Sequence, residues 1–162
     1  MDIKLRNMAS IYISRDDKML MLYRIGSSVV PPSWCGFGGH FEEYELNDAR
    51  ACVLRELKEE MNISEGELDD LQLKYVTLRL KDNEIRQNYY FFADLKPNLI
   101  VNLICNEGKP EWIQYEHILE KEMPYTAKYV LQHYLKIGKY SNHIYGGIAA
   151  LKNVVFTELI DF

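Results

Sequence analysis

The sequence predicts an α+β or α/β/α sandwich with a mixed central sheet. Segments rich in β-branched and aromatic residues indicate strands, and two longer segments with apolar residues three and four apart indicate helices. These segments follow one another as strands, helix, strands, helix, strands. That order is typical of helices covering a sheet, and a length of 162 residues favours a single domain, residues 1–162.

The first part of the chain is predicted to hold a hairpin, a loop and a short strand. Residues 8–14 and 18–25 have strand composition and flank the turn residues Asp16–Asp17. Residues 27–39, "SSVVPPSWCGFGG", contain two prolines and three glycines, so we expect a glycine-rich loop there. Residues 40–43, "HFEE", are expected to form the short strand.

A helix is predicted directly after this loop. Asn47 or Asp48 can serve as its N-cap, and the apolar spacing continues to Met61. Asn62 follows at the position where a helix often ends in a left-handed residue, a conformation that asparagine tolerates second only to glycine.

The second part of the chain is predicted to return to strands around one more helix. Residues 71–81 and 85–95 have the composition of two long strands. Residues 111–118 suggest a short strand or turn, and residues 123–138 have helical spacing. The tail, residues 143–162, is expected to form a late hairpin.

Composition and charge limit the partners. The net charge is −5, and no run of lysines and arginines suggests binding to nucleic acid or an anionic membrane, although a small phosphorylated ligand stays compatible. No apolar run reaches membrane-spanning length. The three cysteines are an odd number without CxxC spacing, which favours a reducing, cytoplasmic location.

The predicted helix 48–61 carries a crowded acidic flank. Glu56, Glu59 and Glu60 stand at i, i+3 and i+4, where like charges repel by roughly 0.2–0.5 kcal/mol per pair. On a helical projection they border the apolar arc that should face the core. Gathered carboxylates are suitable ligands for Mg²⁺, Mn²⁺ or Ca²⁺. Without further context, an acidic solvated face neutralised by Arg55 or Lys58 is the more common explanation of such a pattern.

The surrounding sequence resembles the Nudix box, which the family writes G-x5-E-x7-R-E-U-x-E-E-x-G-U, where U is apolar. The similarity runs from "GFGGHFEEYE" through "CVLRELKEEMNI". Two positions depart from the pattern: nine residues instead of seven separate Glu45 from Arg55, and Asn62 replaces the last glycine. The matching positions are Gly39, Glu45, Arg55, Glu56, Leu57, Glu59, Glu60 and Ile63.

This resemblance implies a Nudix hydrolase that uses Mg²⁺ or Mn²⁺ to cleave a nucleoside triphosphate to a monophosphate and pyrophosphate. By analogy, Glu56, Glu59 and Glu60 hold the metal beside the Gly38 carbonyl. Arg55 is expected to orient a glutamate, Glu59 at i+4. Glu107 stands where similar hydrolases carry an acidic residue that reaches the metal or acts as base, and the resemblance does not decide which glutamate is the base.

The substrate is less well defined. "WCGFGGHFE" is similar to "WNGFGGKVQ" in hydrolases of oxidised purine nucleoside triphosphates such as 8-oxo-dGTP, but Cys35 replaces a base-reading asparagine and Met123 an aromatic residue. Phe37, Gly39 and Trp112 are further candidates for substrate contact. Alternatives are a hydrolase of ADP-ribose or another nucleoside diphosphate derivative, a non-catalytic nucleotide-binding module, and a helix that binds metal only for stability. The oligomeric state is left open.

Overall fold

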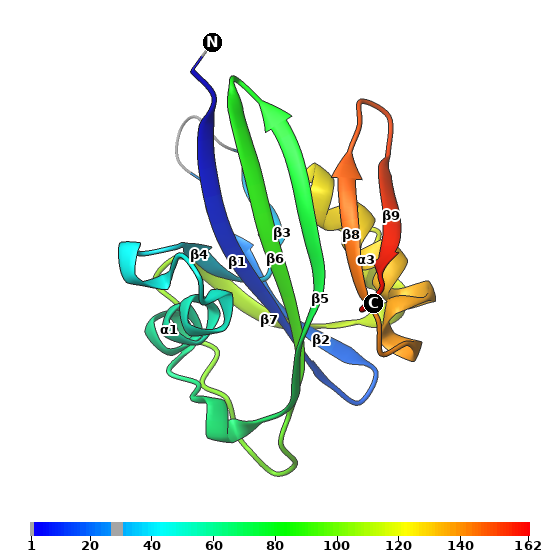
Figure 1. The fold of residues 1–162 in the computed structure, drawn as a ribbon. Helices are drawn as coiled ribbons and strands as arrows, with labels where there is room; N and C mark the ends of the chain where they lie inside the picture. Colours follow the sequence, from blue (N-terminus) through cyan, green and yellow to red (C-terminus); the bar gives the residue numbers. More distant parts are fainter. Residues whose placement is uncertain (1, 27–30) are drawn as a thin grey trace.

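The structure is a computed structural model that describes residues 2–26 and 31–162. Within these residues, nine strands form one mixed sheet (Figure 1). In chain order they are β1 (Lys4–Arg15), β2 (Lys18–Arg24), β3 (Ser33–Cys35), β4 (Phe37–His40), β5 (Leu68–Lys81), β6 (Glu84–Leu95), β7 (Gly108–Gln114), β8 (Ile144–Ala149) and β9 (Val154–Leu159). The helices are α1 (Ala49–Met61), α2 (Tyr115–Ile118) and α3 (Tyr125–Lys136), with short 3₁₀ turns η1 (Glu43–Glu45), η2 (Glu65–Glu67) and η3 (Gly138–Tyr140).

The sheet mixes parallel and antiparallel pairs. Its strand order is β3-β2-β1-β6-β5-β8-β9, while β4 pairs with β1 and β7 pairs with β2. Strand β1 runs parallel to β6, and β5 runs parallel to β8. The other neighbours in this order are antiparallel. This arrangement confirms the predicted α+β fold with a mixed sheet.

The two faces of the sheet are covered by different helices because side chains alternate along each strand. In β1, Ala9, Ile11 and Ile13 point into the core beneath α1. Tyr12 points the other way, into the core that contains Val130 and Leu131 of α3. Helix α1, which carries the acidic flank, and helix α3 therefore cover opposite faces of the sheet, as Figure 1 shows.

Helix α1 has the ends that the sequence predicted. The Asp48 side chain accepts a hydrogen bond of 2.9 Å from the backbone N–H of Ala51, and so caps the first turn. Asn62 adopts the left-handed conformation, with φ 56° and ψ 27°, and its N–H donates to the Lys58 carbonyl. The buried residues of α1 are Cys52, Val53, Leu57 and Met61.

Two predictions around the glycine-rich segment are wrong. The described part of residues 27–39 is mostly extended: Ser33–Cys35 and Phe37–His40 are strands β3 and β4. They pair with β2 and β1, and this tertiary pairing outweighs the low strand preference of glycine. Residues 40–43 do not form a separate strand, because β4 ends at His40 and a 3₁₀ turn begins at Glu43. Residues 27–30 lie outside the described residues.

Several predicted strands are longer than the sequence indicated. Strand β1 starts at Lys4, and its whole length pairs with β6 up to Ser14. Strand β7 starts at Gly108 and is followed by the short helix α2 instead of a turn. No helix in the described part of the chain has both the length and the apolar character needed to cross a membrane.

Candidate active site

The acidic flank of α1 faces the short strand β4, which holds the glycines of the motif. A Cβ atom built on Gly39 would lie 2.5 Å from Oε1 of Glu56, so the absence of a side chain allows this carboxylate to approach the strand. Gly38 has φ 150°, and a Cβ there would collide with the carbonyl oxygen of Ala9. The missing side chain of Gly39 therefore lets the Glu56 carboxylate approach β4, and that of Gly38 lets β4 approach the backbone of β1.

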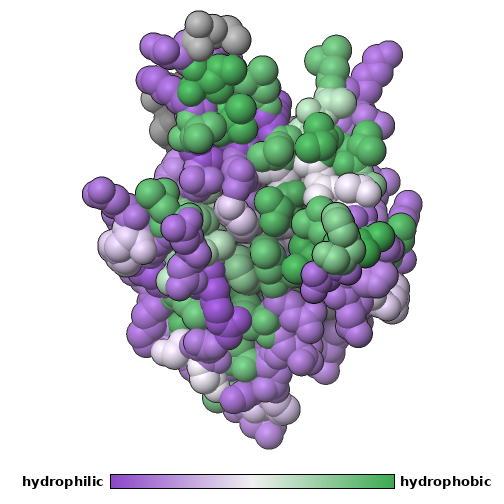
Figure 2. All heavy atoms as spheres, viewed as in Figure 1, coloured by the Kyte–Doolittle hydropathy of each residue, from purple (hydrophilic) through white to green (hydrophobic). Residues whose placement is uncertain are grey.

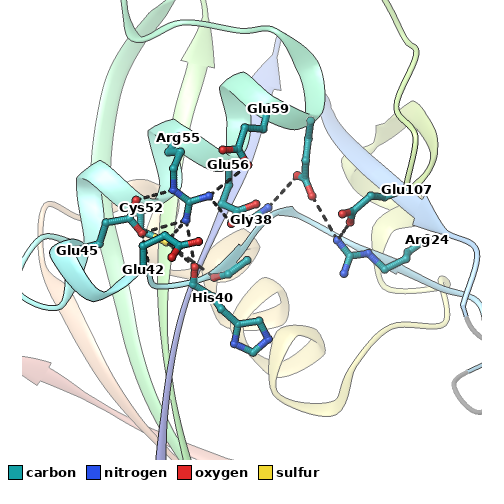
Figure 3. Close-up of polar contacts among 12 residues, drawn as sticks. Arg24, Gly38, His40, Glu42, Glu45, Cys52, Arg55, Glu56, Glu59 and Glu107 are labelled. Atoms are coloured by element: carbon teal, nitrogen blue, oxygen red, sulfur yellow. Dashed lines mark hydrogen bonds and ion pairs between the residues drawn. The ribbon is translucent and has the colours of Figure 1, made fainter.

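Arg55 is the centre of the polar network on this flank (Figure 3). Its guanidinium forms a two-point ion pair with Glu45, at 2.6 Å from Nε and 3.0 Å from Nη2. Nη1 donates to Glu56 at 2.9 Å and to Glu59 at 3.2 Å, and Nη2 donates to the His40 carbonyl at 3.1 Å. The predicted contact with Glu59 is present, but the strongest partner of Arg55 is Glu45.

Glu45 is the buried anchor of this network. Its side chain is 1% exposed, and its Oε2 accepts a hydrogen bond of 2.9 Å from the backbone N–H of Glu42. The Arg55 hydrogen bonds lower the pKa of Glu45 to about 2, against the opposing effect of burial. The two extra residues between Glu45 and Arg55 are accommodated between η1 and α1, so the pairing of these two residues is kept.

Glu60 forms the second half of the site. Its side chain is only 4% exposed, and its Oε2 accepts a hydrogen bond of 3.0 Å from the backbone N–H of Gly38. Arg24, at the end of β2, reaches Glu60 at 3.3 Å and also pairs with Glu107 (Figure 3). Burial, reinforced by the nearby carboxylate of Glu107, raises the pKa of Glu60 to about 8.

The residues at this site fit a divalent cation. Glu60 is a carboxylate held out of water beside other carboxylates, and a cation would relieve both the burial cost and the repulsion. The donors are hard oxygens, which Mg²⁺ and Mn²⁺ prefer. Among residues 2–26 and 31–162, no three acidic, histidine or cysteine side chains stand close enough together to hold a metal ion. Arg24 pairs with Glu60, and Arg55 pairs with Glu56.

A cavity of about 370 Å³ opens beside the carboxylates, on the face of the sheet that α3 covers. Gly38 and Arg24, which both donate hydrogen bonds to Glu60, line it, and Tyr12 and Tyr90 contribute aromatic surface. Its size is in the range of pockets that bind small molecules. The cavity is therefore large enough to hold part of a small-molecule ligand.

The structure brings only some of the predicted substrate residues to this cavity. Cys35 lines it, and Met123 packs beside it, directly before the lining residue Pro124. Phe37 is fully buried in the core beneath α1, because β4 turns this side chain away from the cavity, so the prediction that it contacts substrate is wrong. Trp112, which is half-buried, also packs on the α1 side, with the Arg15 guanidinium 5.5 Å over its ring, and it does not line this cavity; its contact with substrate stays a prediction. Gly39 lies against Glu56.

The other predicted site residues come together at the helix. Glu56, Glu59 and Glu60 share the flank of α1, and Glu107 joins them through Arg24. Gly38 is beside Glu60 through its N–H, whereas the predicted role of its carbonyl stays a prediction. Sequence analysis missed Arg24, which is isolated in the sequence. Its place at the site depends on the register of β2, in which Arg24 stands opposite Ser33 of β3 and Gly108 of β7.

Comparison with known proteins supports this geometry. The NUDIX domain family model matches residues 4–134, so the chain belongs to the Nudix family. It is accordingly a hydrolase of nucleoside diphosphate-linked substrates, a class that uses divalent metal ions. No curated protein sequence matches the chain.

Solved structures share the fold at low sequence identity. The mutator MutT protein from Bacillus halodurans has a TM-score of 0.70 and 21% identity, covering 93% of this chain and 97% of that one. The ORF135 protein of E. coli has a TM-score of 0.67 and 18% identity, with 86% and 95% covered. An Ap4A hydrolase of C. elegans has a TM-score of 0.66 and 17% identity, with 86% and 100% covered.

Proposed function

We propose that the protein hydrolyses a nucleoside triphosphate to the monophosphate and pyrophosphate, with Mg²⁺ or Mn²⁺ as cofactor. The observation that carries this proposal is the pair of carboxylates, Glu56 and Glu60, held against the two glycines of β4, of which Gly38 lines the cavity. A triphosphate placed there has its charged end at the carboxylates and its nucleoside in the cavity.

The proposal assigns a role to each predicted site residue. Glu56, Glu59 and Glu60 would hold the metal, with Glu107 and the Gly38 carbonyl as further ligands. The metal would neutralise the polyphosphate and lower the pKa of a bound water. The water oxygen bonds to phosphorus, the anhydride P–O bond breaks, and pyrophosphate leaves with its electron pair. The proton goes to a carboxylate, for which Glu59 and Glu107, 60% and 51% exposed, are the accessible candidates.

Arg55 is a positioning residue in this proposal. It contacts Glu45, Glu56 and Glu59 together, so it can fix the direction of the two helix carboxylates while Glu45 fixes Arg55. Replacing Arg55 with lysine should retain the charge but lose the two-point pairing, and should lower activity more than stability.

The neighbouring structures supply one rival to the triphosphate. A MutT protein and an Ap4A hydrolase share the fold, so a dinucleoside polyphosphate or another nucleoside diphosphate derivative such as ADP-ribose is the second candidate. A substrate panel separates the two by the product released: pyrophosphate from a triphosphate, or two phosphorylated fragments from a diphosphate derivative.

The test is release of pyrophosphate and phosphate from normal and oxidised nucleoside triphosphates, ADP-ribose and dinucleoside polyphosphates, with and without Mg²⁺ or Mn²⁺. We expect metal-dependent pyrophosphate release that falls at least a hundredfold in Glu59→Gln and Glu60→Gln. The control is Glu43→Gln, an exposed residue of η1. Tight nucleotide binding without turnover at saturating metal would favour a binding module. Loss of thermal stability in EDTA, with no cleavage, would leave the metal a structural role only.

A further inference from the structure

Three arginines stand side by side across three neighbouring strands. Arg6 of β1 is directly opposite Arg86 of β6, and Arg86 is directly opposite Arg79 of β5. We call Arg6, Arg86 and Arg79 the arginine ladder. Residues directly opposite one another project from the same face of a sheet, and like charges in such positions repel. The sheet therefore keeps an arrangement that works against its own stability.

The cavity beside the active site is lined by this ladder. All three arginines, together with Arg24, line the same cavity as Gly38, so four of the seven arginines of the chain meet there. The described lining contains no aspartate or glutamate. The net charge of the whole chain is −5, so this concentration of positive charge is local to the cavity.

One nearby carboxylate balances only part of the positive charge of the arginine ladder. Glu84 pairs with Arg6 at 3.4 Å and with Arg86 at 2.8 Å. Glu84 itself stands between Lys4 and Lys81 in the next row of the sheet. The guanidinium of Arg79 lies 5.1 Å over the ring of Tyr125, so its partner among the described residues is aromatic and not acidic.

The ladder lies at the far end of the cavity from the carboxylates. Ser10 pairs with Gly38, and Arg6 is four residues before Ser10, roughly 13 Å along the strand at about 3.3 Å per residue. The Arg6 guanidinium reaches back to the ring of His40, the residue after Gly39, at 2.7 Å. A molecule with its anhydride at Glu56 and Glu60 would therefore present its other end to the ladder.

We propose that the arginine ladder binds a second anionic group of the substrate, a phosphate on the part of the molecule remote from the hydrolysed anhydride. Guanidinium groups pair with phosphate oxygens through two parallel N–H donors, and three adjacent guanidiniums offer such donors from several directions. This inference rests on the proposed function for the position of the anhydride. It narrows the substrate to nucleoside triphosphates or nucleoside diphosphate derivatives that carry a further phosphate remote from the hydrolysed anhydride.

The test compares substrates that differ only by that phosphate. Suitable pairs are ADP-ribose with its 2′-phosphate, and dephospho-coenzyme A with coenzyme A. We expect kcat/KM to be at least tenfold higher for the phosphorylated member of at least one pair. In Arg79→Gln, which leaves both Glu84 ion pairs intact, and in Arg86→Gln, this ratio should fall below twofold. Arg50→Gln, which removes an arginine paired with Glu65 outside the cavity, should keep it.

Substrate binding measured in the absence of metal tests the inference independently of catalysis. The Kd of each pair, measured by calorimetry in EDTA, should show the same preference and the same loss in Arg79→Gln. If every pair is cleaved equally, within twofold, the inference is overturned while the proposed hydrolysis stands. If no pair and no triphosphate is cleaved, the proposed function fails, and the Kd ratio alone then supports or overturns the ladder as a phosphate site.

Discussion

Gly39 determines where the carboxylate of Glu56 can lie. The Cβ atom of an alanine would be 2.5 Å from Oε1 and 2.6 Å from Cδ of Glu56, but the group it meets is the end of a flexible side chain. We therefore expect Gly39→Ala to fold normally and to displace this carboxylate. Hydrolytic kcat/KM should fall at least tenfold, while the melting temperature should change by only a few degrees.

Gly66 offers the matched control, because a Cβ there would contact nothing within 4 Å. Gly66→Ala should have wild-type activity. Wild-type kcat/KM in Gly39→Ala would show that the approach of Glu56 to β4 is unimportant for turnover. Gly38 cannot serve in this comparison, since an alanine there has a strained φ and collides with backbone.

The sequence predicted individual site residues well where a motif fixed their spacing. Glu56, Glu59 and Glu60 lie on one flank because helical periodicity alone brings positions i, i+3 and i+4 together. Phe37 and Trp112 pack on the α1 side and do not line the cavity, because the face that a strand residue selects depends on its register, which spacing along the chain does not give. Arg24 and the ladder were missed for the same reason: their neighbours are on other strands.

At the scale of elements, the Glu45–Arg55 pair joins η1 to α1. Glu45 is buried and its only charged partner among the described residues is Arg55, so removing its charge leaves a guanidinium without its main acceptor. We expect Glu45→Gln to lower the free energy of unfolding by about 2–4 kcal/mol at pH 7, less than the loss of a fully buried pair because Arg55 keeps other partners. Urea unfolding measures this change, with Glu43→Gln as the exposed control in the same turn.

The difference in the free energy of unfolding between wild type and Glu45→Gln should depend on pH, and the pKa of Glu45 fixes the sign of this dependence. The pKa of Glu45 is lowered to about 2 in the folded protein, against about 4.3 for an unperturbed glutamate. The unfolded state therefore binds the proton first as pH falls, and the stabilisation is present above about pH 5 and lost as pH falls toward 2. The gap between wild type and Glu45→Gln should shrink between pH 7 and pH 3. A gap that stays constant or widens would contradict the ion pair as its source.

Helix α1 shows what the sequence can specify at this scale. Asp48 and Asn62 are caps whose side-chain and backbone preferences are local, so both ends were predicted correctly. Strands β3 and β4 contain proline-flanked and glycine-rich sequence, and they are extended because β2 and β1 provide partners. Local preference therefore specified the helix, and tertiary pairing specified these two strands.

At the scale of the whole molecule, the sheet continues past the segment that the family model covers. That match ends at residue 134, in α3, whereas β8 and β9 extend the sheet beyond β5. Figure 2 shows hydrophobic surface over this hairpin on the viewed face. Ile148, Val155 and Leu159 are exposed residues of the hairpin. The sequence indicated a late hairpin, but its parallel docking on β5 depends on a contact between residues 75 and 145, far apart in the chain.

The aromatic contact between Tyr75 and Tyr145 attaches this hairpin to the rest of the sheet. The two rings stack at 5.5 Å, both side chains are buried, and the Tyr75 hydroxyl bonds the His133 ring of α3 at 2.8 Å. Tyr145→Ala leaves a cavity between β5, β8 and α3, and we expect it to lower the free energy of unfolding by about 3–5 kcal/mol. Tyr145→Phe keeps the ring and loses only the hydroxyl contact with Ser141, so its cost should be about 1 kcal/mol.

Hydrogen exchange shows whether that loss is local or global. If the hairpin docks through this contact, Tyr145→Ala should increase amide exchange in β8, in β9 and in the part of β5 that pairs with β8, Tyr75–Leu78. The α1 face has a separate hydrophobic core. Amides of α1 and β4 should therefore keep their protection relative to global unfolding, and the carboxylates of α1 should keep their geometry. Unchanged exchange in β8 and β9 would show that the hairpin is held by its backbone pairing alone. Equal loss of protection in α1 would show that the two cores unfold as one unit, in which case substitutions in the hairpin reach the active site through stability.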